Sequence, residues 1–285
     1  MGIIDLHLHT NNSDGEYSPS KIVDLAAEAQ LILMSITDHD TVNGIKEGAE
    51  AASSKNIDFI PGIEISTRSA TEQHILGYYI DIENEQLKKM CNYFLELRQE
   101  RMESILKFLV AQGVPLSREQ VKEMAPGEYV GRPHIAAAMI KAGYVGDTQE
   151  AFSRYLASED YFKIERPKPS VEEGIETIRA AGGVAVLAHP HSLRMNGKNL
   201  DRTIAKLKEI GLEGLECLYG AYDPDHSKVY KRLAEKYDLV MTGGSDYHGE
   251  NVKSNVKIGS GQDNRLDYND ISVAEKLRAR AKGIE

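Results

Sequence analysis

IIDLHLHT, residues 3–10, is a short run of apolar and β-branched side chains that also carries one aspartate and two histidines. Its composition and length predict a strand. Because side chains two positions apart in a strand point to the same face, His7 and His9 share a face, about 7 Å apart along the strand. One cation can bind both imidazoles once the strand end bends. A single strand histidine is typical of a hydrogen-bonded core residue, so the interpretation depends on what accompanies this pair.

Strands and helices alternate on both sides of a long helical stretch. The helix predicted at residues 18–30 has Ser18 as its N-cap and Pro19 at its first position, where the missing N–H costs nothing. Seven strands are predicted, at residues 3–9, 31–37, 57–66, 73–80, 183–189, 212–218 and 238–244. Strands separated by helices favour parallel pairing, so the pattern predicts an α/β barrel one strand short of the eight-stranded form.

The alternation is interrupted by residues 84–165, which have helical periodicity and almost no strand character. A long amphipathic helix is predicted at residues 84–113, followed by shorter helices. We therefore divide the chain into a barrel domain, residues 1–83 and 166–285, and a helical insertion, residues 84–165, which we expect to cap the active site.

The composition of the 285 residues limits the class of protein. With 44 acidic and 34 basic side chains the formal net charge is −10, which argues against a DNA duplex or other long nucleic acid as the partner. The start of the chain lacks the pattern of a signal peptide, and no window is apolar enough for a membrane span, so we expect a cytoplasmic protein. Cys91 and Cys217 are far apart and suggest neither a disulfide nor a thiolate metal site. Oligomeric state is not predicted.

Histidines and carboxylates gather at the carboxyl ends of the predicted strands, where an α/β barrel carries its chemistry. The histidines there are His7, His9, His39, His189 and His248. The carboxylates are Asp14, Asp38, Asp40, Glu64, Glu216 and Asp246. Imidazoles with carboxylates and without thiolates are typical of Zn, Mn or Fe sites. The sequence therefore predicts a metal centre at this end of the strands.

Several motifs occur in a fixed order between residues 5 and 249. They are DLHLHT, TDHDT, PGIEIS, HILGY, GRPHIA, LAHP and GGSDYHG. In this set the chain resembles the PHP (polymerase and histidinol phosphatase) family of metal-dependent phosphoesterases. It is most similar to the stand-alone members with GRPHIA in a helical insertion, which include phosphatases of nucleoside 3′,5′-bisphosphates and 5′→3′ exoribonucleases. The resemblance implies a distorted seven-stranded β/α barrel that holds two or three divalent metal ions.

The resemblance also implies a set of metal ligands. The first metal would be bound by His7, His9, Glu64 and Asp246. Glu64 would bridge to a second metal, bound by His74 and His189. A third would be bound by Asp14, His39 and His248, although part of the family has a histidine in place of Asp14, which puts the occupancy of this site in question. His191, in AHPH, stands where a small residue is more usual.

Phosphoester hydrolysis needs a nucleophile at neutral pH and a counter to the charge on the phosphoryl oxygens. Two metals about 3.5–4 Å apart supply both, since water between them loses a proton and attacks in line. No serine or cysteine nucleophile is then required, and the sequence has no G-x-S-x-G or Cys/His signature.

The remaining need is a group that binds the phosphate of the substrate. Arg132 and His134 in GRPHIA are the candidates, because a guanidinium matches phosphate bidentately and Pro133 would begin a helix there. The alternative is a surface arginine and a packing histidine. His226 is a general acid, a substrate ligand, or simply part of a first helical turn. Asp40 is expected to orient a ligand imidazole rather than to bind metal. Four other residues could belong either to the site or to its ordinary surroundings: His191, Glu216, Tyr219 and Tyr222.

The leading hypothesis is a metal-dependent phosphatase that hydrolyses a phosphomonoester of a small nucleotide, with the 3′-phosphate of a nucleoside 3′,5′-bisphosphate as the expected target. The first alternative is a 5′→3′ exoribonuclease on short RNA, which needs a channel beyond the first nucleotide. Basic residues in FKIERPK and HSLRMNGK could line such a channel. A non-catalytic metal-binding module is an alternative from another class, but every ligand position holds a competent side chain. The GRPHIA motif argues against a histidinol phosphatase.

Overall fold

The first sheet contains the strand that carries the paired histidines. In the computed structural model, which describes residues 2–69, 71, 73–125, 130–164 and 168–282, β1 (Ile3–Leu8) pairs in parallel with β2 (Leu31–Ile36). The short β3 (Asp58–Phe59) pairs in parallel with β2. Helix α1 (Pro19–Glu28) connects β1 to β2, and the Ser18 side chain accepts a hydrogen bond from the Lys21 N–H, so the predicted N-cap is confirmed.

A second sheet continues the fold in the order β4-β5-β6-β7-β8. Its strands are β4 (Gly62–Thr67), β5 (Gln73–Tyr78), β6 (Val184–Leu187), β7 (Gly214–Tyr219) and β8 (Val240–Gly244). Two expectations are corrected here. The strand predicted at 57–66 is broken beside Pro61, which lacks an N–H for the ladder. β5 is antiparallel to β4, because a short connection rather than a helix joins the two strands, and it is also antiparallel to β6.

The two sheets meet at both edges without forming one continuous ladder. Leu8 of β1 bridges to Tyr247 just beyond β8, and His39 just beyond β2 bridges to Glu64 of β4. The α/β class is therefore confirmed, and closure of the strands into a seven-stranded barrel stays a prediction. The two bridges lie at the ends of the strands, next to the predicted metal ligands.

Helices cover the outer side of the strands and bury an apolar core against them. These are α2 (Ile45–Ser54), α8 (Val171–Ala180), α9 (Gly197–Ile210), α10 (Pro224–Lys236) and α11 (Ser272–Arg280). Ile65, Ile178 and Leu215 are fully or almost fully buried in this core. Helix α11 and the small hairpin of β9 (Val256–Lys257) and β10 (Gly261–Gln262) were not predicted from the sequence.

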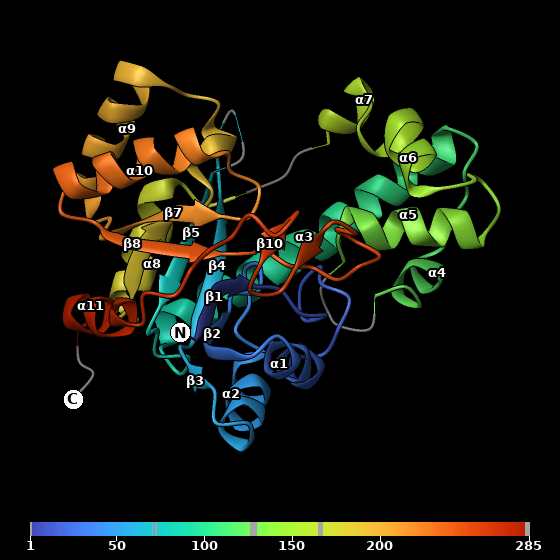
Figure 1. Cartoon of the computed structure of the whole chain (residues 1–285). Coiled ribbons are helices and arrows are strands. Elements are labelled where there is room, and N and C mark those ends of the chain that lie inside the picture. The colour runs from blue at the N-terminus through green and yellow to red at the C-terminus, as the bar shows by residue number, and fades with distance from the viewer. Residues whose placement is uncertain (1, 70, 72, 126–129, 165–167, 283–285) are drawn as a thin grey trace.

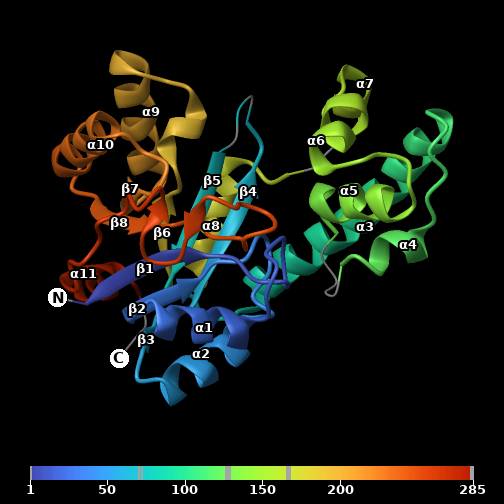
Figure 2. The ribbon, with the colours of Figure 1, turned by 45° about the vertical axis from the view of Figure 1, so that its right-hand side comes forward.

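The helices between β5 and α8 gather on one side of the molecule, opposite α9 and α10, with the strands between them (Figures 1 and 2). They are α3 (Glu85–Ala111), α4 (Arg118–Lys122), α5 (Arg132–Lys141), α6 (Thr148–Ala151), a π-helical turn (Phe152–Leu156) and α7 (Glu159–Phe162). Leu109, Met139 and Leu156 are among the buried side chains of a core that these helices share. In the described part of the chain, no helix is both long and apolar enough to cross a membrane.

Gly244, the last residue of β8, allows close approach to β1. A Cβ on Gly244 would lie 2.3 Å from the His7 Cβ and 2.6 Å from the His7 backbone nitrogen. We expect Gly244→Ala to lower the unfolding free energy by about 1–3 kcal/mol, as overpacked sites do. Thermal unfolding measures this, with Gly146→Ala as the control, since the nearest atom to a Cβ there is at 3.5 Å. An unchanged melting temperature for Gly244→Ala would contradict the close packing of β8 on β1.

Candidate metal centre

The structure brings all nine predicted metal ligands together at one end of the strands. They form four overlapping groups, and within each group the candidate ligand atoms lie within 4.8 Å of one another. The groups are His9-Asp14-His39-His248, His7-His9-Asp246, His7-Glu64-His189 and His39-Glu64-His74. The most exposed of these side chains, Asp14, has only 19% of its surface in contact with solvent. The cluster is therefore a buried set of imidazoles and carboxylates.

Glu64 of β4 lies at the centre of the cluster, and its two carboxylate oxygens face different neighbours. One oxygen, Oε1, lies 2.9 Å from His74 Nδ1 and 3.0 Å from His189 Nε2. The other oxygen, Oε2, lies 3.2–3.3 Å from ring nitrogens of His7, His9 and His39. With one oxygen toward each set of imidazoles, Glu64 would be able to share its carboxylate between two metals.

Asp246 and Asp14 complete two further corners of the cluster. Asp246 Oδ1 lies 3.3 Å from both His9 Nε2 and His248 Nδ1. Asp14 Oδ1 lies 3.2 Å from His248 Nε2, and Asp14 Oδ2 lies 3.9 Å from His39 Nε2. The set predicted for the third metal is thus assembled around Asp14.

The electrostatics of the cluster follow from its burial. Burial opposes a charge on Glu64, but His39, His7 and His74 hold the pKa of this carboxyl well below its usual range. Burial lowers the pKa of His39 to about 3, although Glu64 and Asp14 oppose the shift. The pKa values of His74 and His248 are lowered for the same reason. The carboxylates of the cluster are therefore charged.

Three other imidazoles of the cluster shift in the opposite direction. Burial opposes a charge on His7, His9 and His189, but the surrounding carboxylates raise the pKa of all three, that of His9 to about 9. Because an imidazole binds a metal in its neutral form, a cation that enters this site would displace protons from these rings.

The described residues leave some polar atoms of the cluster without hydrogen bonds. His9 Nδ1, His39 Nδ1 and Asp14 Oδ1 are buried and make no hydrogen bond, although His39 Nδ1 and Asp14 Oδ1 each lie 3.2 Å from an atom of another side chain of the cluster. A buried polar atom without a partner costs about 1–3 kcal/mol, so such atoms usually face a ligand or ion. Together with the donor set of imidazole nitrogens and carboxylate oxygens, they fit a site for more than one divalent cation, with Zn, Mn and Fe as the suitable metals.

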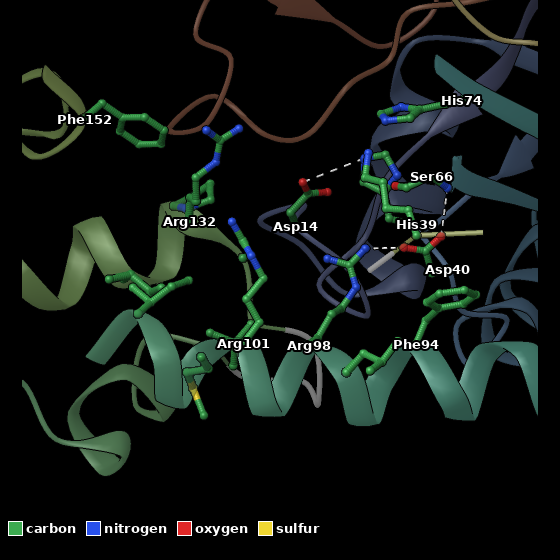
Figure 3. A pocket seen from close by; sticks show the side chains of 18 residues that line it. Asp14, His39, Asp40, Ser66, His74, Phe94, Arg98, Arg101, Arg132 and Phe152 are labelled. Carbon is green, nitrogen blue, oxygen red and sulfur yellow. Dashed lines mark hydrogen bonds and ion pairs between the residues drawn. The ribbon is translucent and has the colours of Figure 1, made fainter. Parts of the chain in front are cut away.

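A small cavity of about 180 Å³ lies beside the cluster. Asp14, His39 and His74 line one side, and arginines from the helices line the other, as Figure 3 shows. Arg98 and Arg101 come from α3, and Arg132 is the first residue of α5. The cavity therefore places cationic side chains opposite the metal cluster.

The three arginines of the cavity have different neighbours. Arg98 forms an ion pair with Asp40, whose other oxygen accepts the Ser66 N–H at 2.8 Å. Arg101 donates to the Tyr161 hydroxyl at 3.0 Å, but its buried Nε has no partner among the described residues. Arg132 lies over the Phe152 ring, 5.5 Å from its centroid. Within the described residues, neither Arg101 nor Arg132 has a carboxylate partner.

Residues 5–241 match the PHP domain family. The chain belongs to the PHP family. This PHP protein is 34% identical over 245 residues to a 5′-3′ exoribonuclease of Haemophilus influenzae. The alignment covers 86% of this chain and 89% of the relative. It is 30% identical over 250 residues to a 3′,5′-nucleoside bisphosphate phosphatase of Chromobacterium violaceum. That alignment covers 87% of this chain and 88% of the relative.

Among solved structures, the PHP protein superposes with a TM-score of 0.84 on an amidohydrolase from Chromobacterium violaceum that contains bound sulfate and no metal. The two sequences are 29% identical, and the alignment covers 98% of this chain and 97% of the other. The family, its relatives and the buried cluster identify the protein as a metal-dependent phosphoesterase, a hydrolase of phosphoester bonds.

Other residues of the PHP motifs hold the cluster in place. Asp5, buried beside His7, accepts the backbone N–H groups of Ser245 and Gly259 at 2.9 and 2.8 Å. Asp38 accepts the Thr10 N–H at 2.7 Å and the Ser13 hydroxyl at 2.5 Å. These carboxylates hold in place the segments that carry Asp246 and Asp14. Asp5 and Asp38 therefore position metal ligands and are not ligands themselves.

Sequence reasoning missed the groups that fix Asp246. Its outer oxygen, Oδ2, accepts the Tyr219 hydroxyl at 2.7 Å and the Lys253 ammonium at 2.6 Å. The sequence left the role of Tyr219 open between the site and ordinary packing, and no local pattern marks Lys253. Arg98 and Arg101 were also missed, although their spacing of three in a helix places them on one face, a signal that was available.

The predicted substrate-binding residues occupy different surroundings. Arg132 lines the cavity, whereas His134 accepts the Gly131 N–H at 3.1 Å through Nδ1, which leaves its Nε2 available. His226 is half exposed, and its Nδ1 lies 3.0 Å from Asp223, away from the cavity lining. The roles of His134 and His226 at the substrate stay predictions. Tyr222 is buried, as ordinary packing requires.

Proposed function

We propose that this PHP phosphoesterase hydrolyses a phosphomonoester of a small nucleotide, the 3′-phosphate of nucleoside 3′,5′-bisphosphates. The observation that carries the proposal is the pairing of a metal cluster with an arginine-lined cavity directly beside it. A substrate with two phosphates needs one site for the reacting group and a second for the other. The relative that is named a 3′,5′-nucleoside bisphosphate phosphatase supports this choice.

The chemistry of the cavity suits the phosphate that does not react. Guanidinium groups bind phosphate oxygens bidentately, and Arg101 and Arg132 have no carboxylate among the described residues to compete for them. Arg132 also begins α5, a helix of ten residues, whose N-terminal end favours an anion. The sulfate in the Chromobacterium violaceum structure is a tetrahedral dianion like phosphate, which agrees with anion binding in this fold.

The metal ligands would be shared among two or three divalent ions. His7, His9 and Asp246 would hold the first, His74 and His189 the second, and Asp14, His39 and His248 the third, with Glu64 between the first two. When bound, such ions lower the pKa of water and withdraw charge from the phosphoryl oxygens. Burial raises the pKa of Cys91 to about 12 and also raises that of Cys217, so neither thiol is suited to act as the nucleophile.

The remaining residues would orient the substrate. Arg101 and Arg132 would hold the second phosphate, and His134 Nε2 would add a hydrogen bond from the same helix. We assign the helices of residues 84–165 as an insertion that caps the active site, because α3 and α5 supply the cavity arginines. His226 would contact the substrate on the side of the leaving nucleoside.

A second candidate is a 5′→3′ exoribonuclease acting on short RNA. A more open hollow adjoins the cavity and shares Phe94 and Lys168 with it. Its lining includes Lys89 and the exposed Tyr93, a combination of cation and aromatic ring that suits a further nucleotide. Lys168 belongs to the predicted basic segment FKIERPK. The relative named 5′-3′ exoribonuclease supports this alternative.

A comparison of three substrates tests the choice. Mn-loaded protein is incubated with adenosine 3′,5′-bisphosphate, with AMP and with a 5′-phosphorylated RNA oligomer, and phosphate and nucleotide products are measured side by side. A clear preference for phosphate release from the bisphosphate supports the phosphatase. Stepwise release of mononucleotides from the oligomer, with slow turnover of the bisphosphate, would replace it with the exoribonuclease.

Arg132→Ala tests the cavity. We expect the KM for adenosine 3′,5′-bisphosphate to rise by about tenfold or more, as loss of a charged hydrogen bond worth about 1.5–3 kcal/mol implies. Metal content, measured by elemental analysis, should not change, because Arg132 is not among the candidate ligands. Arg118→Ala is the matched control, since Arg118 lies on α4 and pairs with Glu103 instead. Unchanged kinetics in Arg132→Ala would remove this residue from substrate binding.

A further inference from the structure

Glu216 lies in the middle of β7 with none of its surface exposed, next to the cluster but outside the four candidate ligand groups. Its carboxylate oxygens are both occupied. Oε1 lies 2.9 Å from His7 Nδ1, and Oε2 accepts the backbone N–H of His189 at 2.6 Å. One buried carboxylate thus contacts two predicted metal ligands that are far apart in the sequence.

The contact with His7 determines which ring nitrogen faces the cluster. A carboxylate accepts hydrogen bonds, so a neutral His7 ring carries its proton on Nδ1 and its lone pair on Nε2. Nε2 is the nitrogen that lies 3.3 Å from Glu64 Oε2 and 3.1 Å from His9 Nε2. Glu216 therefore orients the His7 ring with its metal-binding nitrogen toward the centre of the cluster.

The contact with His189 stabilises an unusual backbone. His189 has φ of 23° and ψ of 64°, in the left-handed region that side chains other than glycine rarely adopt. Such a conformation costs on the order of 1–3 kcal/mol and persists only where other contacts hold it. The hydrogen bond from its N–H to Glu216 is such a contact, and in this conformation the His189 ring reaches Glu64 Oε1 at 3.0 Å.

We propose that Glu216 is a positioning residue that sets the tautomer of His7 and the backbone of His189, and so prepares one ligand on each side of the bridging Glu64. The inference rests on the metal site of the proposed function. Outer carboxylates of this kind fix ring orientation and tautomer in histidine metal sites, and their loss lowers metal affinity or activity by about 10–100-fold.

Glu216→Gln is the sharpest variant because it keeps the size of the side chain. The amide has one acceptor oxygen and one NH2 donor, so it cannot accept from both His7 Nδ1–H and His189 N–H. Either one of the two contacts is lost, or the His7 proton moves to Nε2, the nitrogen that faces the cluster. Glu213→Gln is the matched control. Glu213 directly precedes β7 and pairs with Lys208 and Arg280, away from the cluster.

The test is competition between each protein and a chromophoric chelator for Mn²⁺ and Zn²⁺, with elemental analysis of the bound metal. We expect Glu216→Gln to bind at least one ion about 10–100-fold more weakly than the wild type, and Glu213→Gln to bind like the wild type. At saturating metal, kcat of Glu216→Gln should recover substantially, since Glu216 is not among the residues that line the cavity. Wild-type affinity in Glu216→Gln would overturn the inference, while a wild-type protein that binds neither ion would overturn the proposed metal site itself.

A second measurement needs no variant. Nitrogen-15 NMR of histidine-labelled, Zn-loaded wild-type protein reports which ring nitrogen of His7 carries the proton. The inference requires a protonated Nδ1. A proton on Nε2 would overturn it, whatever the behaviour of Glu216→Gln.

Discussion

Replacing Glu64 by alanine is expected to abolish hydrolysis together with the binding of at least one metal ion. Its two oxygens face separate sets of imidazoles, and no other carboxylate of the cluster contacts both His74 and His189. We expect kcat/KM for adenosine 3′,5′-bisphosphate to fall by at least about a thousandfold, which corresponds to about 4 kcal/mol of transition-state stabilisation. Steady-state kinetics and elemental analysis on the same preparations measure both effects.

The control for this variant is Glu172→Ala on α8, an acidic side chain that lies 3.7 Å from Lys206 and outside the cluster. It should retain wild-type rates and metal content. Full activity in Glu64→Ala would refute the assigned cluster, and lost activity with full metal content would refute its bridging role.

Removal of metal should have a similarly large effect on both activity and stability. Chelation would leave three carboxylates of the cluster, Glu64, Asp14 and Asp246, without the cations that we propose they share. An ion present at 100 times its dissociation constant stabilises the folded state by about 2.7 kcal/mol, so we expect a clear fall in melting temperature. Scanning calorimetry and phosphate release, before and after treatment with EDTA, measure this.

Readdition of Mn²⁺ to the chelated protein should restore both properties, and Glu64→Ala should respond less to either step. Elemental analysis confirms that the chelated protein is free of metal. If that protein kept the melting temperature and the rate it had before chelation, the cluster would not need ions.

The position of the metal centre could be predicted because its signal is local. Alternation along β1 places His7 and His9 on one face, and the ends of successive strands bring their histidines to one edge of the fold. The structure brings these residues together with Glu64 and Asp246 as the sequence pattern indicated. Such a prediction needs only the position of each strand and the end at which its histidines lie, and both can be read from the local sequence pattern.

Features that depend on contacts between distant segments were beyond the sequence. The pairing of β5 with β6, across the helical insertion, is one such feature. The antiparallel direction of β5 beside β4 did have a local signal, the short connection between the two strands. Lys253 reaches Asp246 from a loop, and Arg98 reaches Asp40 from α3. Glu216 could be placed on a strand, but its two contacts depend on how β7 lies beside β1 and β6.

Analysis of the products from adenosine 3′,5′-bisphosphate tests the central claim most directly. The metal-loaded protein should yield adenosine 5′-monophosphate and one equivalent of inorganic phosphate, since we propose that the cluster receives the 3′-phosphate while Arg101 and Arg132 hold the 5′-phosphate. Chromatography against both monophosphate standards distinguishes the two positions. Adenosine 3′-monophosphate as the product, or no phosphate release from protein with full metal content, would contradict the account.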